Sequence, residues 1–339
     1  MKAAVLGCSG LTLREEERQF FAEQEPVGFI LFGRNIQSPE QVQSLVGALK
    51  DCVAASSPLI MIDQEGGRVA RLRPPHWSIY PPAAQIGALY AQNNADGEHA
   101  AHLLGRLIGG ELAALGVNVD CAPVLDVYCE GAHDIIGDRA FGDTAETVAR
   151  LGRKMGEGLM NSGVLPVIKH IPGHGRAGVD SHKALPIVDT SIDILKRTDF
   201  AAFRNYADAP MAMTAHVIYS AIDPENPATI SKTVLGDIVR DDIGFNGLLM
   251  SDDLSMKALK GDLKSRTRAA IEAGCDVALH CNGDLSEMSD VVAACSALSS
   301  QGKFRLDRAL SSVSKLDVIV HDDLMDTLNS LLKGVADHV

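Results

Sequence analysis

The stretch Leu248-Leu249-Met250-Ser251-Asp252-Asp253 shows the pattern that decides the fold, because an uninterrupted apolar run stops abruptly at polar residues. Similar runs recur along the chain and make eight candidate strands: Ala3–Leu6, Gly28–Phe32, Leu59–Ile62, Val117–Cys121, Leu165–Ile168, Met211–Thr214, Leu248–Met250 and Val277–His280. Nearly all of them are continuous rather than alternating, which is typical of strands buried on both faces of a parallel sheet.

Amphipathic segments lie between these runs, with apolar residues at three- and four-residue steps. Helices are predicted over Pro39–Val53, His99–Leu115, Ala145–Asn161, Ile192–Tyr206, Ser231–Asp241 and Thr267–Ala273, and residues from about 284 onward also read as helical. Eight strand–helix units without a break in composition predict an α/β fold, a single (β/α)8 TIM-type barrel domain over residues 1–339 with a C-terminal helical tail. An open doubly wound sheet is the alternative.

Composition limits the possible partners and the compartment. The 339 residues are 46% apolar and 22% charged, as in a globular protein, and the net charge of −13 comes without a Lys/Arg cluster, so nucleic acid is not an expected partner. Seven cysteines without C-x-x-C spacing fit neither a disulfide framework nor a zinc ribbon, which favours the reducing cytoplasm. No run of 18 apolar residues is present, so no membrane association is expected.

Polar residues gather where the apolar runs stop. Asp63, Lys169-His170, His216 and Asp252 each follow or end a predicted strand. The carboxyl ends of barrel strands meet at one face, where the active sites of such barrels lie. We therefore expect these side chains to converge there.

The segment from Lys169 to His182 is a charged strand end that runs into a glycine-rich loop containing Asp180. Asp180 and His182 are two positions apart, so a turn would let the carboxylate bind one ring nitrogen while the other faces a substrate. Such pairing raises the basicity of an imidazole and suits general acid/base catalysis. A surface histidine is the simpler alternative for each ring taken alone.

A zinc site built from His170, His174, His182 and Asp180 is a further alternative, since imidazole and carboxylate are ordinary zinc ligands. The spacing is not H-E-x-x-H, and a glycine-rich loop is a poor support for metal ligands. We therefore expect no metal and no cofactor.

Asp252 and Asp253 are adjacent at the end of a buried strand, so only one of them can point into a barrel. Asp252 is the candidate for the inward position. Asp253 is expected to take a structural role as the N-cap of the following helix.

The segments Lys169–His182 and Gly244–Met256 closely resemble glycoside hydrolase family 3, specifically its single-domain bacterial β-N-acetylhexosaminidases. Family-like stretches also occur, in the family's order, at Gly28–Asn35, Ile62–Val69, Gly137–Phe141 and Met213–His216. The resemblance runs from about residue 28 to residue 283. Arg176-Ala177-Gly178-Val179 departs from the acidic or hydroxyl residues that relatives often carry there, so a different loop mobility or substrate preference is expected.

The resemblance implies a retaining mechanism in which Asp252 is the nucleophile and His182, paired with Asp180, is the acid/base. It also implies that five residues bind the N-acetylglucosamine ring, namely Asp63, Arg71, Arg139, Lys169 and His170. Their alternative role is a structural ion-pair network.

The activity that the resemblance implies is removal of terminal N-acetylglucosamine from 1,6-anhydro-muropeptides in peptidoglycan recycling, so the expected partner is a small carbohydrate. A phosphorylase that passes the sugar to phosphate is a second possibility. A catalytically silent sugar-binding barrel is a third, although Asp180, His182 and Asp252 argue against it. The sequence leaves the oligomeric state open.

Overall fold

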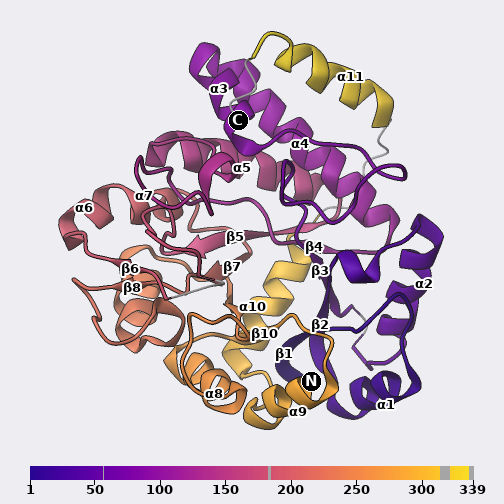
Figure 1. Ribbon diagram of the computed structural model, residues 1–339. Coiled ribbons are helices and arrows are strands. Elements are labelled where there is room, and N and C mark those ends of the chain that lie inside the picture. The colour runs from indigo at the N-terminus through magenta and orange to yellow at the C-terminus, as the bar shows by residue number, and fades with distance from the viewer. Residues whose placement is uncertain (56, 182–184, 314–320, 336–339) are drawn as a thin grey trace.

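The computed structural model describes residues 1–339 except 56, 182–184, 314–320 and 336–339, and it contains a closed barrel of eight parallel strands with helices outside it (Figure 1). Around the ring the strands follow the order β1-β2-β3-β4-β5-β7-β9-β10. They are β1 (Lys2–Gly7), β2 (Pro26–Leu31), β3 (Leu59–Ile62), β4 (Val119–Asp120), β5 (Leu165–Ile171), β7 (Met211–Thr214), β9 (Leu248–Asp253) and β10 (Val277–His280). All eight predicted strands are present, and because the ring is closed, the open-sheet alternative is wrong.

All the barrel strands except the two-residue β4 pack apolar side chains into two separate cores, as the continuous apolar runs predict. On β5, Leu165 and Val167 belong to the cluster inside the barrel, whereas Ile168 and Ile171 belong to the cluster between the barrel and the helices. The apolar part of the strand is therefore buried on both faces, and polar side chains are tolerated only toward its carboxyl end.

The helices surround the barrel, and several begin at a side-chain cap. They are α1 (Glu15–Gln24), α2 (Pro39–Lys50), α3 (Ala83–Gln92), α4 (Asn94–Ala114), α5 (Ala145–Asn161), α6 (Ile192–Arg197), α7 (Asp199–Arg204), α8 (Leu263–Ala273), α9 (Leu285–Ala294), α10 (Ser300–Ser311) and α11 (His321–Leu332). Thr144 caps α5 by accepting a hydrogen bond from the Thr147 N–H, and Ser38 caps α2 ahead of Pro39. The predicted helical tail is confirmed by α9, α10 and α11.

Two predicted helices differ in detail. The segment Ile192–Tyr206 forms α6 and α7 rather than one helix, because the backbone of Thr198 leaves the helical region and its hydroxyl binds the neighbouring Asp199 carboxylate. The segment predicted from Ser231 onward becomes η4 (Val234–Asp242), a π-helix, after the Ser231 side chain accepts a hydrogen bond from the Val234 N–H. Local side-chain bonds of this kind compete with regular helix hydrogen bonds.

Short elements complete the described chain: η1 (Gly33–Asn35), η2 (Gly137–Arg139), η3 (Ala228–Ile230), and a two-stranded sheet of β6 (Ile187–Val188) and β8 (Ile218–Tyr219). The sequence did not predict β6 and β8, which have only two residues each. None of the helices within the described residues is both long and apolar enough to cross a membrane.

The amino-terminal end of the barrel is closed by α10. Leu306 and Ala309 of this helix join the interior cluster together with Val27 and Leu59, which lie at the starts of β2 and β3. Arg305, also on α10, forms an ion pair with Asp276 at 2.8 Å, just before β10. The opposite end, where the strands finish in polar residues, is the end that can bind a ligand.

Candidate active site

A cavity of about 460 Å³ opens at the carboxyl end of the strands. Its wall includes six residues that the sequence singles out: Asp63, Arg71, Arg139, Lys169, His170 and Asp252. A cavity of this size lies within the range that binds small molecules. The strand ends therefore converge as predicted.

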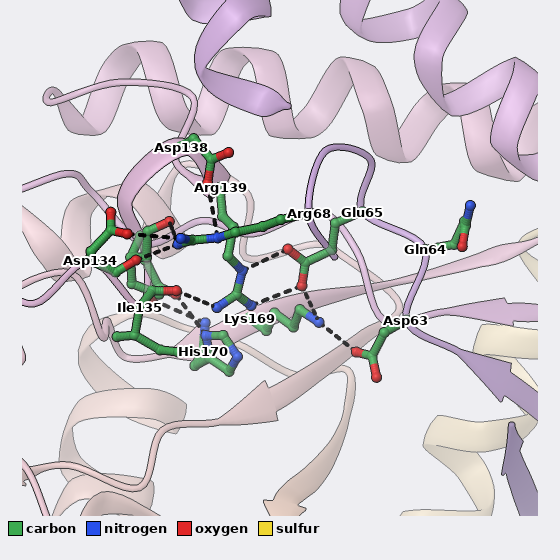
Figure 2. A network of polar contacts seen from close by, with 12 residues as sticks. Asp63, Gln64, Glu65, Arg68, Asp134, Ile135, Asp138, Arg139, Lys169 and His170 are labelled. Atoms are coloured by element: carbon green, nitrogen blue, oxygen red, sulfur yellow. Dashed lines mark hydrogen bonds and ion pairs between the residues drawn. The ribbon is translucent and has the colours of Figure 1, made fainter. Parts of the chain in front are cut away.

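Lys169 lies at the centre of the polar wall and is almost fully buried, with 2% of its surface exposed. Its ammonium group is 2.8 Å from Asp63 Oδ1 and 2.7 Å from Glu65 Oε1, so two carboxylates from the loop after β3 share one cation from β5 (Figure 2). Burial alone favours neutral lysine, but the charges of Asp63 and Glu65 raise the pKa of Lys169 above its ordinary value. The amine is therefore a fixed cationic hydrogen-bond donor.

Glu65 also binds Arg139 in a two-pronged ion pair. Arg139 Nε is 2.8 Å from Oε2 and its Nη2 is 2.9 Å from Oε1, while Nη1 donates to the Ile135 carbonyl at 2.8 Å (Figure 2). Burial works against ionisation of Glu65, yet Arg139 and Lys169 together hold its pKa below the ordinary value. Glu65 therefore joins two predicted sugar-binding cations into one rigid unit.

Arg71 extends the network along the cavity wall. Its guanidinium is 3.2 Å from Asp63 Oδ2, and it lies over the Phe32 ring with 5.1 Å between the guanidinium carbon and the ring centre. Arg34 lies at the same distance from that ring. Burial works against ionisation of Asp63, but Lys169 and Arg71 lower the pKa of its carboxyl group. Asp63 is therefore held as an anion that can accept hydrogen bonds from hydroxyl groups.

Below His170 lies a buried carboxylate, Asp126, in the segment that follows β4. Its Oδ2 is 2.7 Å from His170 Nδ1, and its Oδ1 accepts hydrogen bonds from the backbone N–H groups of His170 and His174 at 3.2 and 2.6 Å. Burial opposes ionisation, but interaction with His170 lowers the pKa of Asp126. The contact fixes the orientation of the His170 ring in the cavity wall.

His174 is buried next to His170, and its Nε2 is 3.2 Å from the Ser181 hydroxyl. Burial, and then repulsion by His170, lowers the pKa of His174 to about 4. The ring is therefore neutral near pH 7. It links the start of the glycine-rich loop to Ser181, the residue after Asp180.

Asp252 lies near the end of β9 with its side chain half-buried in the cavity wall. Its backbone N–H donates to the Thr214 hydroxyl at 3.3 Å, and its Oδ1 accepts from the Asp253 N–H at 2.7 Å. The strand and these contacts fix the carboxylate in position. A fixed carboxylate at the cavity wall is the arrangement that a nucleophile requires.

Asp253 is structural, but it is not a helix N-cap, so that part of the prediction is wrong. Its carboxylate accepts hydrogen bonds from the Ser255 N–H at 3.1 Å, the Ser255 hydroxyl at 2.5 Å and the Cys281 N–H at 3.1 Å. These bonds stabilise a turn and join β9 to the end of β10. The next helix, α8, begins only at Leu263 and is capped by Asp262.

The glycine-rich loop is anchored at its start. Tyr219 donates its hydroxyl hydrogen to the Gly173 carbonyl, and Gly173 has a φ of +140°, which a residue with a side chain rarely adopts. Farther along, Arg176 forms a 2.7 Å ion pair with Asp199. These contacts place the loop that carries Asp180 at the carboxyl end of β5.

His182, the predicted acid/base, lies outside the described residues, so its pairing with Asp180 stays a prediction. The same holds for the zinc alternative, which includes His182. Among the residues that the structure does describe, no group of three or more His, Cys, Asp or Glu side chains is arranged to hold a metal ion.

The family model described as the glycosyl hydrolase family 3 N terminal domain matches residues 2–316. The chain belongs to this family. It is 42% identical over 282 residues to a β-hexosaminidase from Alkalilimnicola ehrlichii, covering 82% of this chain and 80% of that one. It is 36% identical to a β-hexosaminidase from Idiomarina loihiensis, covering 92% and 93% of the two chains.

A solved structure of the same family is also similar throughout. It is the crystal structure of NagZ from Neisseria gonorrhoeae in complex with N-trifluoroacetyl-D-glucosamine, with 30% identity, a TM-score of 0.86 and 98% coverage of both chains. The family 3 barrel found here therefore has a counterpart of matching extent that binds a glucosamine derivative.

In this family 3 chain, one strand-end residue does not join the cavity wall. His216 follows β7 but is fully buried, with Nδ1 2.7 Å from the Thr229 hydroxyl and Nε2 3.0 Å from the Asp253 carbonyl. Burial lowers the pKa of His216. His216 therefore packs beneath β9 and supports this strand through the backbone of Asp253.

Sequence reasoning assigned no role to Glu65 and Asp126. Glu65 follows Asp63 by two positions, and that spacing was a signal, since both side chains leave the strand end on the same side. Asp126 interrupts the apolar stretch Ala122-Pro123-Val124-Leu125-Asp126-Val127, and a lone acid in such a stretch needs a buried partner. Which partner it takes could not be found without the fold.

Proposed function

We propose that the chain is a retaining β-N-acetylglucosaminidase that removes terminal, non-reducing N-acetylglucosamine from 1,6-anhydro-muropeptides during peptidoglycan recycling in the cytoplasm. Family 3 membership and about 40% identity to β-hexosaminidases make it a glycoside hydrolase of the β-hexosaminidase type. The observation that carries the finer proposal is the cavity, in which Asp252 shares one wall with the fixed charges of Asp63, Lys169 and Arg139. We further propose that residues 1–339 act as one catalytic domain.

In the proposed reaction, Asp252 attacks the anomeric carbon while the bond to the leaving oxygen breaks. His182, paired with Asp180, gives its proton to that oxygen. The sugar is then held as an ester of Asp252. Water attacks the same carbon, the ester bond breaks, and His182 recovers a proton from the water, so the product retains its β configuration. Both steps use only side chains and water.

The ionised wall suits a neutral sugar with several hydroxyl groups. Asp63 accepts hydrogen bonds, whereas Lys169, Arg139 and Arg71 donate them, so adjacent hydroxyls meet groups of both kinds. The ion pairs among these residues hold them in place before the substrate arrives. Such preorganisation reduces the entropy cost of binding. The ion-pair network and the sugar-binding role are thus compatible.

The test uses a defined N-acetylglucosaminyl-1,6-anhydromuramyl peptide and NMR to identify the first sugar released. The expected product is β-N-acetylglucosamine, formed at a rate that does not depend on phosphate. Asp252→Ala is expected to lower kcat/KM by at least about 1,000-fold, since the covalent step is lost. Mass spectrometry after reaction with a 5-fluoro-N-acetylglucosaminyl fluoride is expected to show the sugar on the peptide containing Asp252.

An initial α product, or unchanged activity in Asp252→Ala, contradicts the retaining mechanism. A sugar phosphate formed only when phosphate is present indicates the phosphorylase instead. Asp253→Asn serves as the control for the neighbouring carboxylate, because its bonds to Ser255 and Cys281 are structural. It is expected to affect stability more than the chemical step.

A further inference from the structure

Asp126 is fully buried between the segment after β4 and the carboxyl end of β5. One of its oxygens binds the His170 ring, and the other binds the backbone N–H groups of both His170 and His174. The segment itself is attached to β5, because the Leu125 N–H donates to the Lys169 carbonyl at 2.7 Å. One carboxylate therefore fixes the ring and the backbone of a residue in the cavity wall.

The chemistry of this contact decides which ring nitrogen of His170 carries the proton. An ionised carboxylate only accepts hydrogen bonds, so Nδ1, at 2.7 Å from Asp126, must be the nitrogen that donates. In the neutral ring, Nε2 is then left with a lone pair. His170 lies in the cavity wall, where such a lone pair can accept a hydrogen bond from a hydroxyl group.

We infer that Asp126 is a positioning residue for the proposed hydrolysis, on which this inference rests. It holds His170 as the tautomer that presents Nε2 to a sugar hydroxyl. Through the N–H of His174 it also fixes the point at which the loop carrying Asp180 leaves β5. Asp126 is buried beneath the wall and acts on the substrate through His170.

Asp126→Asn separates the two contacts. The amide oxygen can still accept from the backbone of His170 and His174, whereas the amide NH₂ replaces the acceptor that faces His170 Nδ1. The ring is then expected to change to the tautomer protonated on Nε2, which cannot accept from the sugar. Carboxylates that orient catalytic imidazoles in metal sites are worth about 10- to 100-fold in activity, and a loss of that size in kcat/KM is expected here.

Two comparisons distinguish this role from loss of folding or of acid catalysis. The loss in Asp126→Asn is expected to be the same for aryl N-acetylglucosaminides with good and poor leaving groups, because the lost contact is to the sugar. Asp276→Asn is the matched control, since Asp276 is also a buried carboxylate but lies at the opposite end of the barrel, bound to Leu249, Arg240 and Arg305. It is expected to lower stability without changing kcat/KM.

The direct readout is ¹⁵N NMR of histidine-labelled protein at pH 8, with His170 assigned by comparison with His170→Gln. The proton is expected on Nδ1 in the natural protein and on Nε2 in Asp126→Asn. The inference is overturned if the His170 tautomer is unchanged in Asp126→Asn, or if the tautomer changes while kcat/KM stays at its natural value. It is also overturned if folded Asp276→Asn loses as much kcat/KM as Asp126→Asn. If the natural protein cleaves no N-acetylglucosaminide, the proposed function fails, while the NMR result still decides whether Asp126 sets the tautomer.

Discussion

At the scale of single residues, the site depends on a few carboxylates that each bind more than one cation. Glu65 binds both Lys169 and Arg139, and all three side chains are largely buried. Charges taken out of water in this way are costly unless each one keeps its partners. Removing one member therefore affects the others, so the network responds as a unit.

We expect Glu65→Gln to lower the free energy of unfolding by about 3–5 kcal/mol, because it leaves Arg139 buried without its carboxylate. The KM for an N-acetylglucosaminide should rise as Arg139 and Lys169 lose their fixed positions. Urea unfolding at pH 7 and steady-state kinetics measure the two effects.

Glu98→Gln is the control for this prediction. Glu98 pairs with Arg150 at 2.7 Å on the surface, where an ion pair contributes at most about 1 kcal/mol. Equal destabilisation by the two substitutions would contradict the central role of Glu65.

The sequence alone predicted which residues gather at the cavity but not how they pair. Asp63, Lys169 and Asp252 end apolar runs, so their convergence follows from the barrel. The pairing of Asp126 with His170 joins residues 44 positions apart. Such contacts depend on how loops lie over the strand ends, and short-range sequence patterns contain no information on that.

At the scale of elements, the glycine-rich loop after β5 is attached to the start of α7. Arg176 forms its ion pair with Asp199 and also donates to the Thr198 hydroxyl at 3.1 Å. The same two residues break the predicted helix Ile192–Tyr206 into α6 and α7. The break in the helix thus gives the loop an anchor at Arg176.

We expect Arg176→Ala to lower kcat/KM by about 10- to 100-fold for substrates with poor leaving groups, and by less for activated aryl glycosides. The loop carries the proposed acid pair, and a small displacement of a catalytic group is costly where protonation of the leaving group is needed. Steady-state kinetics over a series of leaving groups measures this dependence.

The matched control is Arg153→Ala, since Arg153 pairs with Asp208 at 2.6 Å on the outer surface. It should leave the whole series unchanged. A loss in Arg176→Ala that is independent of the leaving group would mean that the loop positions the sugar rather than the proton donor.

Elements were predicted more reliably where burial determines them. Nearly all of the barrel strands are apolar runs buried on both faces, and α5 coincides with its predicted bounds Ala145–Asn161. The predictions were wrong at Thr198 and Asp253, where side chains bind nearby residues of the same segment. Each of the two also binds a residue from another segment, Arg176 and Cys281 respectively.

At the scale of the whole molecule, buried histidines tie stability to pH. The pKa of His174 is lowered to about 4 by burial, whereas an unfolded histidine titrates near its ordinary value of 6.5. Between these values the unfolded chain binds the additional proton. The contribution of His174 to stability is therefore complete above pH 6.5 and is lost as the pH falls toward 4.

The size of this contribution is on the order of 3 kcal/mol, from a shift of about 2.5 pH units. We expect the free energy of unfolding to fall between pH 6.5 and 4.5, and to fall less in His174→Gln. Urea unfolding across that interval measures the slopes. His76 lies on the exposed surface, so His76→Gln should keep the natural slope. An unchanged slope in His174→Gln would contradict the assignment of this pH dependence to His174.

The helix that closes the amino-terminal end of the barrel also has a kinetic consequence. With Leu306 and Ala309 filling that end, material enters and leaves the cavity through the mouth above the strands. In the proposed reaction, the leaving group departs before water hydrolyses the ester of Asp252, so N-acetylglucosamine is the last product released. We therefore expect free N-acetylglucosamine to compete with the next substrate for the cavity, so that the reaction slows as this product accumulates.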